Sequence, residues 1–331
     1  MLKELLEAKK CFKLVCGAGN EDALEVEKLV ALYSAAGCKF FDLSAKPEIV
    51  EAAKRGLRGR EGYLCVSVGI KGDPHVRKAQ IDYEKCAGCH KCEEICPQKA
   101  LLIDTSSPFA AHIKRVYGRM LNASALRPLL AARCIGCGKC YSVCRHGAIS
   151  FVSENKDLRE VLPPLIEKGI DCIELHAMGD NDDEVYEKWD YINHVYDGIL
   201  SICTARGHLS EEKMISRIKE MISLRKPYTT IVQADGFPMS GGKDDYKTTL
   251  QAVATAEIVQ NAKLPVYIML SGGTNSKTAE LAKMCSIDYN GIAIGTFARK
   301  VAGRYIERED FLRNEYVFNE ALKSVIPLIN L

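Results

Sequence analysis

Short apolar runs alternate along most of the chain with longer segments whose apolar residues recur every three or four positions. The short runs are rich in Val, Ile and Phe, which predicts strands, and the longer spacing predicts helices. The predicted strands are 12–16, 38–43, 63–68, 170–175, 198–202, 228–233, 265–270 and 291–294. The predicted helices are 21–36, 47–57, 157–168, 182–194, 210–224, 245–262, 276–285 and a C-terminal helical region. Regular alternation of strand and helix is typical of a parallel α/β fold.

One segment, 78–153, interrupts this alternation after the third predicted strand. The flanking residues, 1–77 and 154–331, together have close to the ~250 residues typical of a (β/α)8 barrel. We therefore predict an α/β protein, a TIM-like barrel with an inserted α+β domain at 78–153. An open doubly wound sheet is the alternative, although the order of elements indicates no topological switch point. Because βα loops lie on the catalytic face of a barrel, the insertion is expected at the barrel mouth.

The inserted segment has two cysteine runs of identical spacing, CxxCxxCxxxC, which account for eight of the 15 cysteines. This spacing is typical of bacterial two-cluster ferredoxins, in which the fourth Cys of each run binds the cluster of the other run. Cluster I is then bound by Cys86, Cys89, Cys92 and Cys144. Cluster II is bound by Cys134, Cys137, Cys140 and Cys96. Zinc is the alternative metal, but a zinc site typically takes two pairs of ligands rather than a run of four. We predict two [4Fe–4S] clusters.

Two features around the clusters suggest contact with a partner. Apolar residues of 113–121 fall on one helical face beside basic residues, which fits either a docking surface for an electron donor or a packed cover. Arg145 follows the second run where the first run has Pro97. It is either a contact for an acidic partner or an exposed loop residue.

Composition excludes several classes of protein. The 47% apolar and 27% charged residues are ordinary for a soluble globular chain, and the net charge of +2 provides no field for nucleic acid or an anionic membrane. No apolar run approaches the ~20 residues of a membrane span, and the N-terminus lacks the apolar block of a signal peptide. Cubane clusters and many free thiols predict the reducing cytoplasm. Most of the seven other cysteines are expected to be buried apolar residues, with a functional role left open for Cys16 and Cys203.

Glycine-rich segments follow the seventh and eighth predicted strands, where barrels commonly bind phosphate. The candidate phosphate ligands are Gly272, Gly273, Gly295 and Thr296, with Arg299 as a charge partner. A phosphate-bearing small molecule, FMN in particular, would suit this place beside two clusters. The alternative is that these glycines only form tight turns.

Polar residues at other strand ends are candidates for chemistry at the mouth. The catalytic candidates are His176, Asp235 and Lys71, and further polar positions are Asp42, Arg206 and Gln233. His176 and Glu174 share one face of a strand, so both are expected to point into the barrel. A histidine there is either an acid–base group or a hydrogen-bonded core residue. The loop 234–243 is expected to be a lid or a cofactor-facing loop, and Asp235 either orients a substrate or caps the turn.

The order of several motifs resembles one protein family. The segments FKLVCGAG, FDLSA, QADGFPMSGG, LSGGTN and GIAIGTFARK, together with the cysteine runs, resemble the light-dependent period protein A (LdpA) family of iron–sulfur proteins. In cyanobacteria that family is linked to redox input to the circadian clock, so the resemblance implies redox sensing by the clusters. It supports the eight cluster ligands and transfers no clock role.

Two functions therefore stay open. One is an electron-transfer or redox-sensing protein that relays electrons between its clusters and a redox protein partner or a ligand at the barrel mouth. The other is an FMN-dependent oxidoreductase of a small substrate fed by the clusters. No acid–base pair or nucleophile signature is evident at the mouth, which favours the first. A purely structural role for the clusters is a third reading.

Overall fold

Eight parallel strands close into a barrel in the computed structural model, which describes residues 1–331 except 74–76, 102–130, 154–156, 208, 237–241 and 331. The strand order around the barrel is β1-β10-β9-β8-β7-β6-β3-β2. The strands are β1 (Cys11–Val15), β2 (Phe40–Ser44), β3 (Tyr63–Gly69), β6 (Cys172–His176), β7 (Ile199–Ala205), β8 (Thr230–Asp235), β9 (Tyr267–Ser271) and β10 (Gly291–Ile294). The closed barrel confirms the predicted TIM-like fold. Each strand begins within two residues of its predicted first residue.

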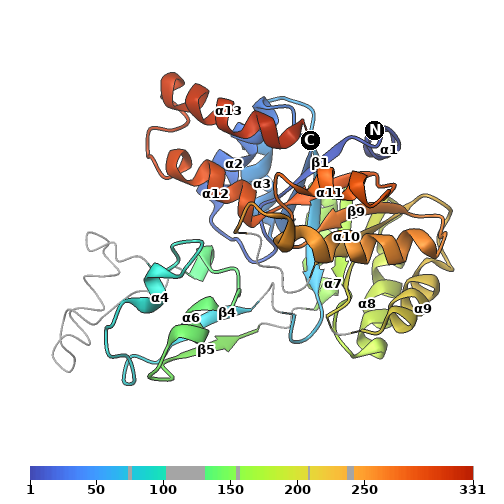
Figure 1. Cartoon of the computed structure of the whole chain (residues 1–331), viewed down its shortest axis with the longest axis horizontal. Helices are drawn as coiled ribbons and strands as arrows, with labels where there is room; N and C mark the ends of the chain where they lie inside the picture. The colour runs from blue at the N-terminus through green and yellow to red at the C-terminus, as the bar shows by residue number, and fades with distance from the viewer. Residues whose placement is uncertain (74–76, 102–130, 154–156, 208, 237–241, 331) are drawn as a thin grey trace. The chain divides into compact units, whose positions relative to one another are not determined.

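Helices separate the strands along the chain and cover the outside of the barrel (Figure 1). Asp22, Asn181 and Ser210 begin three of them by accepting a hydrogen bond from a first-turn amide. The barrel helices are α2 (Ala23–Ala35), α3 (Pro47–Leu57), α7 (Leu158–Glu167), α8 (Asp182–Val195), α9 (Glu211–Ile222), α10 (Tyr246–Asn261), α11 (Thr278–Met284), α12 (Thr296–Ile306) and α13 (Glu315–Ile329). The predicted C-terminal helical region is thus two helices.

A short helix before the first strand, α1 (Leu2–Glu7), was not expected from the sequence. Its Leu2 and Leu6 are buried and pack with Cys11, Phe40 and other side chains from the N-terminal ends of the strands. The helix therefore closes the amino end of the barrel interior with an apolar layer.

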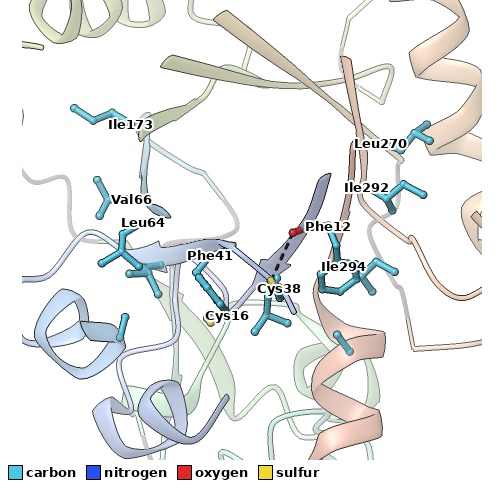
Figure 2. Packing of buried hydrophobic residues seen from close by; sticks show 14 of the residues in the cluster. Phe12, Cys16, Cys38, Phe41, Leu64, Val66, Ile173, Leu270, Ile292 and Ile294 are labelled. Atoms are coloured by element: carbon cyan, nitrogen blue, oxygen red, sulfur yellow. Dashed lines mark hydrogen bonds between the residues drawn. The ribbon is translucent and has the colours of Figure 1, made fainter. Parts of the chain in front are cut away.

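The main hydrophobic core lies between the strands and the helices. Figure 2 shows part of it, where Phe12, Phe41 and Ile294 come from different strands. The Cys38 thiol donates to the carbonyl of Phe12 at 3.5 Å within this core. Six of the seven cysteines outside the two runs are buried, as expected, and Cys285 is exposed. Among the described residues, no helix combines the length and apolarity that crossing a membrane requires.

The chain divides into two compact units, which are the barrel and a smaller unit formed by Gly19–Glu21 and Pro74–Glu154. The smaller unit contains β4 (Lys78–Ile81), α4 (Lys91–Glu94), a 3-10 turn (Ala131–Arg133), α6 (Lys139–Val143) and β5 (Ile149–Val152). β4 and β5 pair antiparallel, with Lys78 opposite Val152 and Ile81 opposite Ile149. The predicted helix 113–121 lies outside the described residues.

Candidate metal centres and the barrel interior

The first cavity of the smaller unit is lined by Cys86, Cys89, Cys92 and Cys144, and the cavity with its open mouth spans about 450 Å3. Three of these cysteines come from the loop before α4 and the start of that helix, and Cys144 ends α6. His90, Lys91 and His146 also line the cavity. The structure thus brings together the four residues that the spacing assigns to cluster I.

The second cavity is lined by Cys134, Cys137, Cys140 and Cys96, and the cavity with its open mouth spans about 350 Å3. Gly136 and Gly138 turn the loop around it with positive φ angles of 66° and 79°, which side chains with a Cβ rarely adopt. Its remaining lining is apolar apart from Gln98. Four thiols around each cavity are the donor set that a cubane iron–sulfur cluster requires, so the residues present fit two clusters.

The two cavities differ in exposure. Cys134 and Cys140 of the second cavity are buried, whereas each cysteine of the first is at least partly exposed. Two backbone amides donate to sulfur at the second cavity, Ala79 to Cys134 and Ala100 to Cys96, both at 3.3 Å. These amides already point where negative charge on a bound cluster would lie.

Desolvation raises the pKa of three of the thiols that line the two cavities. Desolvation, followed by the neighbouring thiols Cys137 and Cys134, raises the pKa of Cys140 to about 12. Desolvation is also the main cause that raises the pKa values of Cys92 and Cys96. These thiols are therefore protonated at neutral pH until a metal displaces the protons, which makes binding release protons.

The barrel interior holds a network of ionisable side chains centred on Glu174. Lys13 donates from Nζ to Glu174 Oε2 at 2.7 Å and to Gln233 Oε1 at 2.9 Å. Ser201 and Gln233 also donate to Glu174, at 2.7 Å and 2.9 Å. Asp42 lies 3.8 Å from Lys13 and accepts from Ser67. All these side chains are buried, so each charge depends on its partners.

His176 extends this network toward the carboxyl ends of the strands. Its Nδ1 lies 2.6 Å from Asp73 Oδ2, and its Nε2 lies 3.6 Å from Glu174 Oε1. Burial lowers the pKa of His176, but Asp73 and Glu174 more than offset this and raise it well above its usual 6.5. The interior thus holds a protonated imidazole between two carboxylates.

Cys203 donates to Asp235 Oδ2 at 3.1 Å, also inside the barrel. The donor atoms of Cys203, Glu174 and His176 lie within 4.8 Å of one another, which is close enough to hold a metal ion. Glu174 already accepts hydrogen bonds from Lys13, Ser201 and Gln233, so this group is satisfied by protein partners.

Of the three predicted catalytic candidates, two are buried in the barrel and one is exposed. His176 and Asp235 lie in the barrel interior, and so do Asp42 and Gln233. Lys71 and Arg206 are exposed, and Arg206 pairs with Glu211 at 3.1 Å. Sequence reasoning missed Lys13 and Asp73. A lysine in the middle of an apolar strand run was a signal for the first, whereas Asp73 belongs to a loop and gave none.

The predicted phosphate glycines lie against the protein's own backbone. A Cβ on Gly272 would come within 2.6 Å of Gly236 N, and one on Gly273 within 2.5 Å of Thr248 O. Both glycines also have positive φ angles, 65° and 83°. Tight packing therefore accounts for Gly272 and Gly273 without a ligand.

The other half of the predicted phosphate site is different. Thr296 begins α12 next to Gly295, and Arg299 is buried beside them, donating to Val15 O at 2.5 Å and to Thr296 Oγ1 at 3.4 Å. Arg299 Nε has no acceptor among the described residues. An anion at this end of β10 stays a prediction. Of the predicted lid, residues 237–241 lie outside the described residues.

Comparison with known proteins agrees with both units. Residues 164–325 match the light dependent period A C-terminal domain, and residues 85–149 match a 4Fe-4S dicluster domain. The chain is 28% identical over 321 residues to light dependent period A of Synechococcus elongatus, covering 92% of this chain and 84% of that protein. The family resemblance indicated by the sequence motifs is confirmed.

Solved structures similar to this chain have low sequence identity. The YdjI aldolase of Escherichia coli K12 has a TM-score of 0.48 and 7% identity, covering 99% of this chain and 93% of that chain. A monomeric dihydrodipicolinate synthase variant has a TM-score of 0.44 and 10% identity, covering 97% and 80%.

Proposed function

On the premise that this chain is a light dependent period A-like iron–sulfur protein, we propose that it relays electrons between its two clusters and a redox protein partner. The observation that carries the proposal is the pair of four-cysteine cavities in one small unit. A [4Fe–4S] cluster, when bound, accepts and releases one electron at a time. The partner we propose is a one-electron donor or acceptor protein, because each cluster exchanges one electron at a time.

This chain's residues provide the binding and the environment. Cys86, Cys89, Cys92 and Cys144 would hold cluster I, and Cys134, Cys137, Cys140 and Cys96 would hold cluster II. The exposure of Cys89 and Cys137 leaves one edge of each cavity accessible from solvent. Electron exchange with a partner is favoured at such edges, because transfer weakens steeply with the thickness of protein between centres.

Metal content is the first test of this function. Protein purified without oxygen should contain about eight iron and eight sulfide per chain. Four iron, or stoichiometric zinc, would contradict it.

Crossed ligation is the sharper test. Electron paramagnetic resonance of the reduced protein should show that Cys96→Ser and Cys137→Ser alter one and the same signal, and that Cys144→Ser and Cys89→Ser alter the other. Cys285→Ser is the matched control, because Cys285 is exposed and belongs to the barrel unit. If Cys96→Ser alters the signal that Cys89→Ser alters, the ligands are not crossed.

A second candidate function is an oxidoreductase that binds a small substrate in the barrel and receives electrons from the clusters. The observation in its favour is the buried network of His176, Asp73 and Glu174, because a protonated imidazole can donate a proton to a reduced substrate. The matched domains indicate iron–sulfur clusters and give no support to FMN. Turnover of a substrate that fails in His176→Gln with both clusters intact would favour this function over the relay.

A further inference from the structure

Gln98 is a buried polar side chain in the otherwise apolar lining of the second cavity. It follows Cys96 and Pro97 in the chain and is 8% exposed. Its side-chain nitrogen Nε2 is buried and has no hydrogen-bond acceptor among the described residues. A buried amide donor without an acceptor is unfavourable, and because Gln98 lines the cavity, an acceptor bound there would satisfy it.

The lining of the cavity restricts what that acceptor is. Apart from Gln98 and the four cysteines, the cavity is lined by Ala79, Pro97, Ala100, Leu101, Ile135, Gly138 and Phe151. None of these side chains accepts a hydrogen bond. Among the described side chains that line the cavity, sulfur is the acceptor that remains, and it belongs either to a cysteine or to a sulfide of the bound cluster.

We propose that Gln98 donates an Nε2 hydrogen bond to a sulfur of cluster II and thereby keeps this buried cluster reducible. The inference rests on the proposed function, because it requires cluster II to be bound by Cys134, Cys137, Cys140 and Cys96. Gln98 is thus a positioning residue that raises the reduction potential of cluster II and is not one of its ligands.

The need for such a donor follows from burial. Adding an electron increases the negative charge of a cluster, and a low-dielectric surrounding disfavours that charge more than water does. Cys134 and Cys140 are buried, so cluster II has the stronger penalty of the two. Hydrogen bonds to sulfur stabilise the reduced form and offset the penalty.

Two cations that contact the cluster II loop support the same effect. Arg77 donates from Nε to Gly136 O at 2.9 Å, and its guanidinium lies 4.3 Å from the ring centre of Phe151. Lys78 donates to Cys134 O at 2.9 Å. Both hold the backbone of the cluster II loop and place positive charge near it. Gln98 therefore completes a set of groups that favour reduction, and among the described residues it is the polar side chain, besides the cysteines, that lines the cavity.

The test is a redox titration followed by electron paramagnetic resonance on the full chain holding both clusters. Gln98→Leu removes the donor and should shift the cluster II equilibrium about tenfold toward the oxidised form, which is about 59 mV for one electron, with cluster I unchanged. The matched control is Gln80→Leu, since Gln80 is an exposed glutamine on β4 of the same unit. An unchanged potential of cluster II in Gln98→Leu would overturn the inference.

A second measurement needs no substitution and covers the case in which Gln98→Leu loses cluster II. Wild-type protein labelled with 15N in glutamine side chains should show hyperfine coupling between nitrogen and reduced cluster II, because Gln98 is the glutamine that lines this cavity. Absence of coupling would overturn the hydrogen bond even if both clusters are present. Failure of the proposed function has a different signature, a metal content well below eight iron per chain in the wild type.

Discussion

Replacing Lys13 by Met tests whether the barrel interior depends on charge compensation. Lys13 is fully buried and makes short contacts with Glu174 and Gln233, with Asp42 at 3.8 Å and the Phe40 ring centre at 5.3 Å. Met has a similar length and keeps the packing. The substitution therefore removes one cation and leaves two buried carboxylates without it.

The magnitude follows from what remains around Glu174. Removing one partner of a buried ion pair typically destabilises a protein by about 3–5 kcal/mol. Ser201 and Gln233 still donate to Glu174, and His176 lies 3.6 Å away, so we expect the lower end, about 3 kcal/mol. Adding Glu174→Gln to Lys13→Met removes the uncompensated charge and should recover about 1–2 kcal/mol of that loss.

The assay uses the single tryptophan of the chain. Trp189 is 2% exposed, and its indole donates to Met221 O at 2.6 Å within the barrel unit. Its fluorescence during urea unfolding therefore reports the barrel, while cluster absorption reports the smaller unit separately. A loss below about 1 kcal/mol for Lys13→Met, or no recovery in the double variant, would refute charge compensation by Lys13.

Three further predictions concern pH, glycine and anions. Because the pKa of His176 is raised in the folded barrel, its stabilising contribution is complete below about pH 6.5 and is lost as pH rises through the raised value. Urea unfolding should then show the stability difference between wild type and His176→Gln shrinking toward alkaline pH, and a constant difference would contradict this. Gly273→Val should lower the melting temperature of the barrel with or without ligand, because its Cβ would meet Thr248 O, whereas Gly303→Ala, with open space around it, should not. If the β10 end binds an anion, millimolar phosphate or FMN should raise the wild-type melting temperature but not that of Arg299→Met, and no shift in the wild type would end both the phosphate and the flavin readings.

The barrel and the grouping of the eight cysteines around two cavities could be predicted because both leave local patterns. Strand and helix periods are read from neighbouring residues, and the cysteines of each run are three or four positions apart. The helix α1 was missed because only Leu2 and Leu6 of its short length are buried, which is too few for a clear period. Local pattern was sufficient where the interacting residues are close in sequence.

The interior network could be predicted only in part, since its members come from distant segments. His176 and Glu174 were found from the two-residue period of one strand, but the ion pair of Glu174 with Lys13 joins positions 161 residues apart. The glycine pattern was ambiguous for a different reason. A glycine is needed both where a phosphate binds against the backbone and where another backbone segment packs closely. At Gly273 only the nearby carbonyl oxygen of Thr248 shows that close packing is the reason.

The antiparallel pairing of β4 with β5 has a consequence for the assembly of the barrel. β3 and β6 are neighbours in the barrel, yet roughly a hundred residues separate them along the chain, and closing so long a loop has an entropic penalty. Pairing Lys78 with Val152 holds the two ends of the insertion together. The number of residues in the loop that must close between β3 and β6 then falls to roughly a quarter of its full length. Loop-closure scaling makes this worth about 1 kcal/mol. An insertion that loses its clusters and unfolds would therefore weaken the barrel through chain entropy alone, whatever contacts the two units make.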